Sequence, residues 1–262
     1  MRPAHHRIRA KLEAGEKAYG IAVQLPSPEI VEAVGWTGYD FVWIDAEHGS
    51  LDFSEIRELI RAADAADIDA LVRVMNHDPS AIQQVLDLGA AGIIAPDVRT
   101  VADAEALVSA AHFGPGGTRG ACPCGRAVGH LTHDWAADVR RMDANVLLFA
   151  IIEHPDGVQN AEGIAAAGVD GLLFGPFDLA MTLGLGGDVH HPQIAEMQKH
   201  VIEATRSAGI EYVSPNVAWE EDLDATGCRV IPVTGDRVAL VTTFQRLLAE
   251  AKGAPAPAPS IA

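Results

Sequence analysis

Short apolar segments recur along the chain, and between them the apolar residues are spaced as on one face of a helix. The short segments are rich in Val, Ile and Leu and do not alternate strictly with polar residues. This composition is typical of parallel strands that are covered on both faces. The pattern predicts strands at residues 18–25, 39–45, 69–74, 91–96, 145–153, 169–175, 211–217 and 228–235.

Helix signals fill the intervals between these strands. After the second strand, Ile56 and Leu59 share one face, and acidic residues occupy the first turn. After the third strand, Asp78 is suited to cap a helix that Gly89 ends. The pattern predicts helices at residues 52–66, 78–88, 100–111, 155–167, 191–208 and 236–251.

Alternation of strands and helices over the whole chain predicts an α/β fold, a (β/α)8 TIM barrel, because parallel neighbours need a helical crossover. The alternative is an open doubly wound sheet. That fold wants a glycine-rich phosphate loop after its first strand, which here ends in QLPSPE. We expect one barrel domain over residues 1–252 and a disordered Pro/Ala-rich tail over 253–262. The last helix is too apolar for a monomer surface, which predicts that subunits exchange it.

Composition and charge restrict the classes of partner. The chain has 262 residues, is 48% hydrophobic and carries a formal net charge of −17. Such a surface repels phosphate backbones, so nucleic acid is not expected as a partner. The sequence contains no apolar run of membrane-spanning length and no apolar signal segment near its start, so we expect no membrane association and a cytoplasmic location.

Three cysteines fit a reducing compartment better than a disulfide framework. Cys122 and Cys124 form a Cys-Pro-Cys pair in a loop. Without a second pair this is weak evidence for zinc, and unpaired loop thiols are the simpler interpretation.

Ionisable residues stand where several predicted strands end. Asp45, Glu47 and His48 follow the second strand, and Arg73 lies in the third. Glu153 ends the fifth strand, and Asp178 lies just past the sixth. Each residue alone has a structural interpretation: an internal salt bridge, a turn, a helix N-cap or a solvated loop. Chemistry in a (β/α)8 barrel sits at the carboxyl ends of the strands, so their shared edge favours an active site.

The residue types fit metal-assisted enolisation. Glu153 and Asp178 offer hard oxygen ligands for Mg²⁺ or Mn²⁺. Arg73 can hold the oxygens of a 2-oxo acid, and His48 is the natural proton carrier, because histidine is the residue type whose ordinary pKa lies near neutral pH. Asp45 and Asp87 are both candidates for the acid that supports His48. The backbone N–H groups of Gly175 and Phe177, on either side of Pro176, can bind a carboxylate.

Several stretches together resemble the class II pyruvate-dependent aldolases of the HpcH/HpaI family, which make and break C–C bonds beside 2-oxo acids. They are LEAGEKAYG (12–20), IDAEHGSLD (44–52), LVRVMNHDPSAIQQVLDLGAAGIIAP (71–96), GPGGTRG (114–120) and IIEHPDGVQNAEGIAAAGVDGLLFGPFDLAMTLG (151–184).

The resemblance implies a role for each matching residue. Glu153 and Asp178 match the two metal carboxylates, and a divalent Mg²⁺, Mn²⁺ or Co²⁺ ion is implied. His48 matches the catalytic histidine, and Asp87 matches the aspartate paired with it. Arg73 matches the arginine beside the pyruvyl oxygens. The residues that match the carboxylate-binding backbone are Gly175, Pro176 and Phe177, and Asp45 and Glu47 match the surroundings of the histidine.

The resemblance also implies an assembly and a reaction. Members assemble as hexamers, trimers of dimers, that exchange the last helix. The implied reaction is reversible cleavage of a 4-hydroxy-2-oxo acid to pyruvate and an aldehyde, through a metal-bound pyruvate enolate. Oxaloacetate decarboxylation, or a citrate-synthase-like condensation of the enolate, uses the same first step. A coenzyme A thioester lyase and a non-catalytic binding barrel are further alternatives.

The sequence departs from the sugar-acid aldolases of this family at two places. Ile151 stands where a glutamine is usual, two residues before the metal glutamate. The loop CPCGRAVGH (122–130) is unusual, and Arg119 and Arg126 near it are candidates to bind an acidic acceptor aldehyde. No lysine ends the sixth strand, which argues against Schiff-base chemistry.

Overall fold

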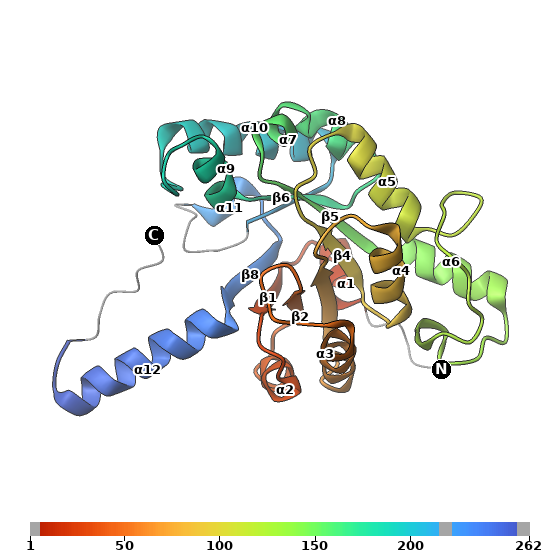
Figure 1. The fold of residues 1–262 in the computed structure, drawn as a ribbon, viewed down its shortest axis with the longest axis horizontal. Helices are drawn as coiled ribbons and strands as arrows, with labels where there is room; N and C mark the ends of the chain where they lie inside the picture. Colours follow the sequence, from red (N-terminus) through yellow and green to blue (C-terminus); the bar gives the residue numbers. More distant parts are fainter. Residues whose placement is uncertain (1–5, 215–221, 256–262) are drawn as a thin grey trace.

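The computed structural model describes residues 6–214 and 222–255. Its strands are all parallel and form one sheet in the order β7-β6-β5-β4-β3-β2-β1-β8. Because β7 also contacts β8, the sheet is a nearly closed TIM-type barrel (Figure 1). The strands are β1 (Ala18–Val23), β2 (Phe41–Asp45), β3 (Asp69–Arg73), β4 (Gly92–Ala95), β5 (Leu147–Ile152), β6 (Gly171–Phe174), β7 (Glu211–Val213) and β8 (Val230–Gly235).

Helices precede, connect and follow the strands, and most of them lie outside the barrel (Figure 1). They are α1 (Arg7–Glu13), α2 (Pro28–Trp36), α3 (Phe53–Ala65), α4 (Pro79–Asp87), α5 (Val101–Ala111), the short 3-10 helix η1 (Arg126–Val128), α6 (Trp135–Asn145), α7 (Pro155–Gln159), α8 (Ala161–Ala165), α9 (Pro176–Thr182), α10 (Pro192–Ala208), α11 (Leu223–Thr226) and α12 (Asp236–Lys252).

The predicted strands are confirmed, with ends trimmed by one or two residues. The end of the predicted strand 211–217 and most of the predicted tail, residues 256–262, lie outside the described residues. The helix predicted over 155–167 is wrong as one element. It breaks at Asn160, whose side-chain amide donates to the carbonyl of Arg99 at 2.9 Å.

Two apolar clusters lie on opposite faces of the sheet, one outside the barrel and one inside it. The larger joins strands to the surrounding helices. The smaller contains strand residues and α1 residues only, so it fills the inside of the barrel. Inward positions recur at every second residue of a strand. Phe41 and Trp43 on β2 therefore lead to Asp45, and Phe149 and Ile151 on β5 lead to Glu153.

Glycines make room for the large inward side chains. A Cβ on Gly20 would lie 2.4 Å from the Phe41 ring, and one on Gly171 would lie 2.9 Å from the Phe149 ring. The small residue on one strand thus accommodates the aromatic ring on its neighbour, as layered packing inside a barrel requires.

Helix α1 closes the amino-terminal end of the barrel. Ile8 is fully buried in the inner cluster, and its N–H donates to Asp69, at the start of β3, at 2.9 Å. Arg9 reaches Asp170, just before β6, at 3.0 Å. Burial raises the pKa of Asp69 to about 7, although the Ile8 amide opposes the shift. The barrel therefore has a floor, and its open mouth is at the carboxyl ends of the strands.

Helix α12 extends away from the barrel (Figure 1). Its exposed apolar residues are Leu240, Val241, Phe244, Leu247 and Leu248. A stripe of this size on a helix that leaves the barrel is typical of a surface that another chain covers. Among the helices of the described residues, none combines the length and the apolar character needed to cross a bilayer.

Candidate active site

Arg73 lies at the centre of a polar cluster in the barrel mouth. Its Nε and Nη2 donate to Oδ1 and Oδ2 of Asp45 at 2.8 and 2.6 Å. Its Nη1 lies 3.0 Å from Oε2 of Glu47, an ion-pair distance. Gln24, just past β1, donates to Asp45 Oδ2 at 2.7 Å. Asp45 thus holds the guanidinium at two points and fixes the direction of its remaining N–H groups.

The environment keeps this pair charged. Burial alone would raise the pKa of Asp45, but the hydrogen bonds from Arg73 and Gln24 outweigh it and lower that pKa. Burial would likewise lower the pKa of Arg73, and the carboxylates of Asp45, Glu47 and Glu153 raise it instead. The Trp43 ring lies below, with its centroid 5.2 Å from Arg73 Cζ. Arg73 is therefore a fixed, permanent cation.

Glu153 enters the mouth from β5. Its Oε1 accepts the backbone N–H of Asp97 at 2.7 Å. Asp97 has φ 49°, a left-handed conformation that Asp tolerates better than most residues. A Cβ on Gly175 would lie 2.6 Å from Glu153 Cβ and 3.1 Å from Oε2. Gly175 therefore provides space for the carboxylate. Its own N–H donates to the carbonyl of Ile152 at 2.9 Å, so its predicted role as a carboxylate donor would require that N–H to be shared.

The carboxylates in the mouth repel one another. Burial raises the pKa of Glu153 to about 7, and the charges of Glu47 and Asp178 add to the increase. Burial also raises the pKa of Glu47, with Asp45 and Asp178 contributing and Arg73 opposing. Asp178 is exposed in the first turn of α9. A cation among these groups would remove the repulsion, so the residues fit a divalent metal.

The residues of the mouth would hold a metal ion with part of its coordination sphere left open. Within residues 6–214 and 222–255, no three His, Cys, Asp or Glu side chains converge closely enough to enclose an ion. Two carboxylates at the open end of the barrel leave coordination positions for water and substrate, which is the usual arrangement for Mg²⁺ or Mn²⁺ in catalysis.

His48 lies at the rim. Its backbone N–H donates to Asp45 Oδ1 at 3.2 Å, and its side chain is 59% exposed. Its Nε2 is 3.9 Å from Glu47 Oε2. No hydrogen bond from the described residues holds the imidazole ring, which is exposed above the mouth.

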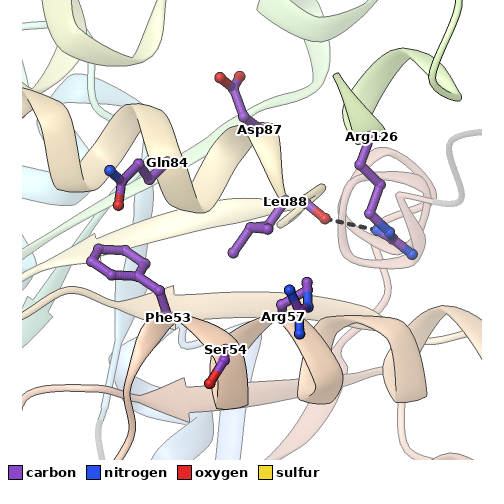
Figure 2. A pocket seen from close by; sticks show the side chains of 7 residues that line it. All are labelled: Phe53, Ser54, Arg57, Gln84, Asp87, Leu88 and Arg126. Carbon is purple, nitrogen blue, oxygen red and sulfur yellow. Dashed lines mark hydrogen bonds between the residues drawn. The ribbon is translucent and has the colours of Figure 1, made fainter. Parts of the chain in front are cut away.

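Asp87 is bonded elsewhere in its own chain. As the last residue of α4 it accepts from Arg119 Nη2 at 2.8 Å, and among the described contacts it has none with His48. It lines a surface pocket of about 410 Å³ between α3 and α4 (Figure 2). Figure 2 shows its carboxylate directed away from Phe53 and Leu88. The pocket belongs to the helix layer, whereas the clustered ionisable side chains lie in the barrel mouth, which is therefore the candidate site.

The two loop arginines are also engaged in the helix layer. The Arg119 side chain is only 3% exposed, and its guanidinium lies over the Phe113 ring at 4.6 Å. Arg126 binds Asp64 and donates to the carbonyl of Leu88 at 2.7 Å (Figure 2). Neither is free to bind an acidic acceptor in this chain.

The remaining residues singled out from the sequence are Pro176, Phe177, the two loop cysteines and Ile151. Pro176 is buried and begins α9, whereas the Phe177 ring is 45% exposed. Cys122 and Cys124 are exposed free thiols with their sulfurs 3.5 Å apart. Ile151 is buried in the inner cluster below Glu153, so an apolar side chain replaces the usual polar contact there.

Two groups that position the site residues were not predicted from the sequence. They are the side chain of Gln24, which donates to Asp45, and the backbone N–H of Asp97, which donates to Glu153. Gln24 could have been found, because it is the first polar side chain after an apolar strand whose inward positions share its parity. The Asp97 N–H carries no signal in the sequence, since a backbone donor is defined only by its conformation.

Comparison with known proteins gives the chain its family. The profile of the HpcH/HpaI aldolase/citrate lyase family matches residues 19–239. A hydroxypyruvate/pyruvate aldolase of Pseudomonas aeruginosa is 30% identical over 97% of this chain and 96% of its own. A 4-hydroxy-2-oxovalerate aldolase of Novosphingobium aromaticivorans is 37% identical over 78% of this chain and 79% of its own.

A solved structure extends the match to three dimensions. An HpcH/HpaI family protein of Burkholderia cenocepacia superimposes with a TM-score of 0.87 and 30% identity, over 95% of this chain and 98% of that one. Sequence and fold thus agree over almost the whole chain, which belongs to the HpcH/HpaI aldolase/citrate lyase family.

Proposed function

We propose that the chain is a divalent-metal-dependent aldolase that cleaves 4-hydroxy-2-oxo acids reversibly to pyruvate and an aldehyde. One observation carries the proposal. The mouth gathers the carboxylates of Asp45, Glu47, Glu153 and Asp178 near one fixed arginine, and burial and mutual repulsion raise the pKa of Glu153 to about 7. That is a site short of positive charge, of the kind that a cation and a polarised 2-oxo acid complete.

Glu153 and Asp178 are the residues that would hold the metal, and Glu47 faces the same space. When bound, a divalent ion supplies Lewis-acid stabilisation of negative charge on the substrate's ketone oxygen. Gly175 keeps the approach to Glu153 open, and the N–H of Phe177 in the first turn of α9 is a donor for the substrate carboxylate.

Arg73 and His48 have separate tasks. Arg73 directs its free N–H groups at the pyruvyl oxygens and stabilises the charge that develops there. His48 takes the proton of the 4-hydroxyl as the C3–C4 bond breaks. The electron pair of that bond moves into the pyruvate enolate, the aldehyde leaves, and protonation of the enolate at C3 gives pyruvate.

His48 lacks an acid partner at bonding distance within the described chain, and Asp87 is engaged on the helix layer. We propose that Asp87 serves His48 of a second copy. The exposed apolar stripe of α12 supports a homo-oligomer, and a hexamer with exchanged α12 helices is the assembly we propose.

The test is pyruvate release from 4-hydroxy-2-oxo acids by protein stripped with EDTA, coupled to lactate dehydrogenase. We expect release only after Mg²⁺ or Mn²⁺ is restored, and none from Glu153→Gln under the same conditions. Consumption of oxaloacetate without release of pyruvate from hydroxy-oxo acids would instead favour the decarboxylase or synthase alternative.

A further inference from the structure

Arg237 is a cation at the barrel mouth for which residues 6–214 and 222–255 supply no carboxylate partner. It lies in the first turn of α12, directly after β8 and the buried Asp236. Its Nη2 donates to the backbone carbonyl of Gln24 at 3.3 Å, and its backbone N–H bonds to Asp236 Oδ1 at 2.7 Å. The guanidinium therefore lies beside Gln24, the residue that joins β1 to Asp45.

The contacts of Arg237 with the described residues do not explain why a charged side chain stands at this position. The first turn of a helix carries a positive partial charge, so a cation there does not stabilise α12. Most arginines of the described segments pair with an acid, and Arg237 has no such ion pair within them. Arg206, which also has none there, is exposed on the outer helix α10.

The order of the strands indicates what Arg237 faces. The groups proposed for the pyruvyl half, Arg73, Glu153 and Asp178, belong to β3, β5 and the turn after β6. His48 follows β2, and the sheet order runs β2-β1-β8 from there. In the proposed reaction His48 takes the proton of the 4-hydroxyl, which would place the aldehyde half of the substrate over β2, β1 and β8, where Arg237 stands.

We infer that Arg237 binds a carboxylate on the aldehyde half of the substrate, an inference that rests on the proposed function. A guanidinium fork matches a carboxylate in geometry. On a chain with a net charge of −17, an anionic acceptor needs a local cation to enter an acidic mouth. Arg119 and Arg126, the candidates from the sequence for this task, are each paired with an acid of their own chain, Asp87 and Asp64.

The experiment compares two acceptors of equal carbon count, 4-oxobutanoate and butanal, in metal-supplemented condensation with pyruvate. We expect wild type to favour 4-oxobutanoate. Arg237→Gln should lower the ratio of kcat/KM for 4-oxobutanoate over butanal about ten- to a hundredfold, mainly through KM, because a charge-assisted hydrogen bond is lost. Arg237→Lys should recover part of the ratio.

Arg206→Gln is the matched control, since it removes the same charge from the outer layer and should leave the ratio unchanged. The inference is overturned if Arg237→Gln lowers both acceptors equally, changes neither, or if wild type does not condense 4-oxobutanoate. Deuterium exchange at C3 of pyruvate without aldehyde reports the enolate step alone. Its absence in wild type would overturn the proposed function, whereas exchange with an unaltered ratio overturns only the role of Arg237.

Discussion

Arg73 and Asp45 are joined by two nearly parallel hydrogen bonds, Nε to Oδ1 at 2.8 Å and Nη2 to Oδ2 at 2.6 Å. Their side chains are only 12% and 3% exposed. A pair of this kind fixes direction as well as charge. The orientation of the Arg73 guanidinium therefore depends on a residue on the neighbouring strand.

The first prediction is that Asp45→Ala destabilises the protein by about 3–5 kcal/mol, because it leaves the buried Arg73 without its main partner. Urea unfolding measures the change. Glu250→Gln is the control: it breaks the exposed Arg246–Glu250 pair on α12 and should cost less than about 0.5 kcal/mol. Equal effects of the two substitutions would contradict the importance of the Asp45 pair.

The second prediction concerns the cost of keeping Glu153 in the mouth. Its pKa is raised from 4.5 to about 7, so the folded state binds this proton more tightly than the unfolded state. The metal-free protein should lose stability as pH rises from about 4.5 to 7. Glu153→Gln should then be more stable than wild type by about 2–3 kcal/mol at pH 8 and equally stable at pH 4. The exposed Glu162→Gln should show no such dependence.

The third prediction also concerns the proton on the Glu153 carboxyl group. If Glu153 binds the metal, then a bound cation must displace that proton below about pH 7, so Mn²⁺ affinity should fall between pH 8 and pH 6. Calorimetry in two buffers of different ionisation enthalpy would count the protons released. An affinity and a proton count that do not change with pH would exclude Glu153 as a ligand.

The fourth prediction tests His48 and Asp87 together. His48→Ala should slow pyruvate release about a hundred- to ten-thousandfold, the usual range for a general base, while Mn²⁺ binding is retained. Asp87→Ala should also be slow. If Asp87 serves a second copy, co-assembled His48→Ala and Asp87→Ala chains should regain activity that neither has alone. Mixtures as inactive as the single variants would remove Asp87 from the site.

The fifth prediction concerns α12. Phe244→Glu with Leu248→Glu places charges in the exposed apolar stripe and should shift the protein from oligomer to monomer in light scattering. Gln245→Glu, on the same helix, adds a charge outside the stripe and should leave the mass unchanged. A monomeric wild-type protein would contradict the proposed exchange of α12 between subunits.

The strands were predictable because burial on both faces leaves runs such as LLFAII (147–152), in which every residue is buried. The break at Asn160 was not, since it depends on a hydrogen bond to Arg99, far away in the sequence. Helix α2 carried a usable signal: Ser27 caps it, and Pro28 begins it. Helix α1 did not, because its role as a floor depends on acids that begin other strands.

The site divides in the same way. Arg73 and Glu153 could be located from strand ends alone, since strand geometry fixes where they point. Residues on helices and loops could not. Asp87 and Arg119 looked like independent candidates in the sequence, yet they form a pair at 2.8 Å. Arg237 carried a signal of the same kind, since it stands two residues past the predicted strand 228–235. That it neighbours β1 and Gln24 follows only from the strand order.

The regular alternation inside the barrel has a consequence for how such a protein can change. On β2, β3 and β5 the lower inward positions serve packing and an ionisable side chain follows them at the top, as Glu153, directly after β5, follows Phe149 and Ile151. A substitution at the last position alters reactivity without disturbing the layers beneath. Loss of a single residue within the strand would turn the whole set outward. The scaffold thus tolerates new substrates readily but not a shift in register.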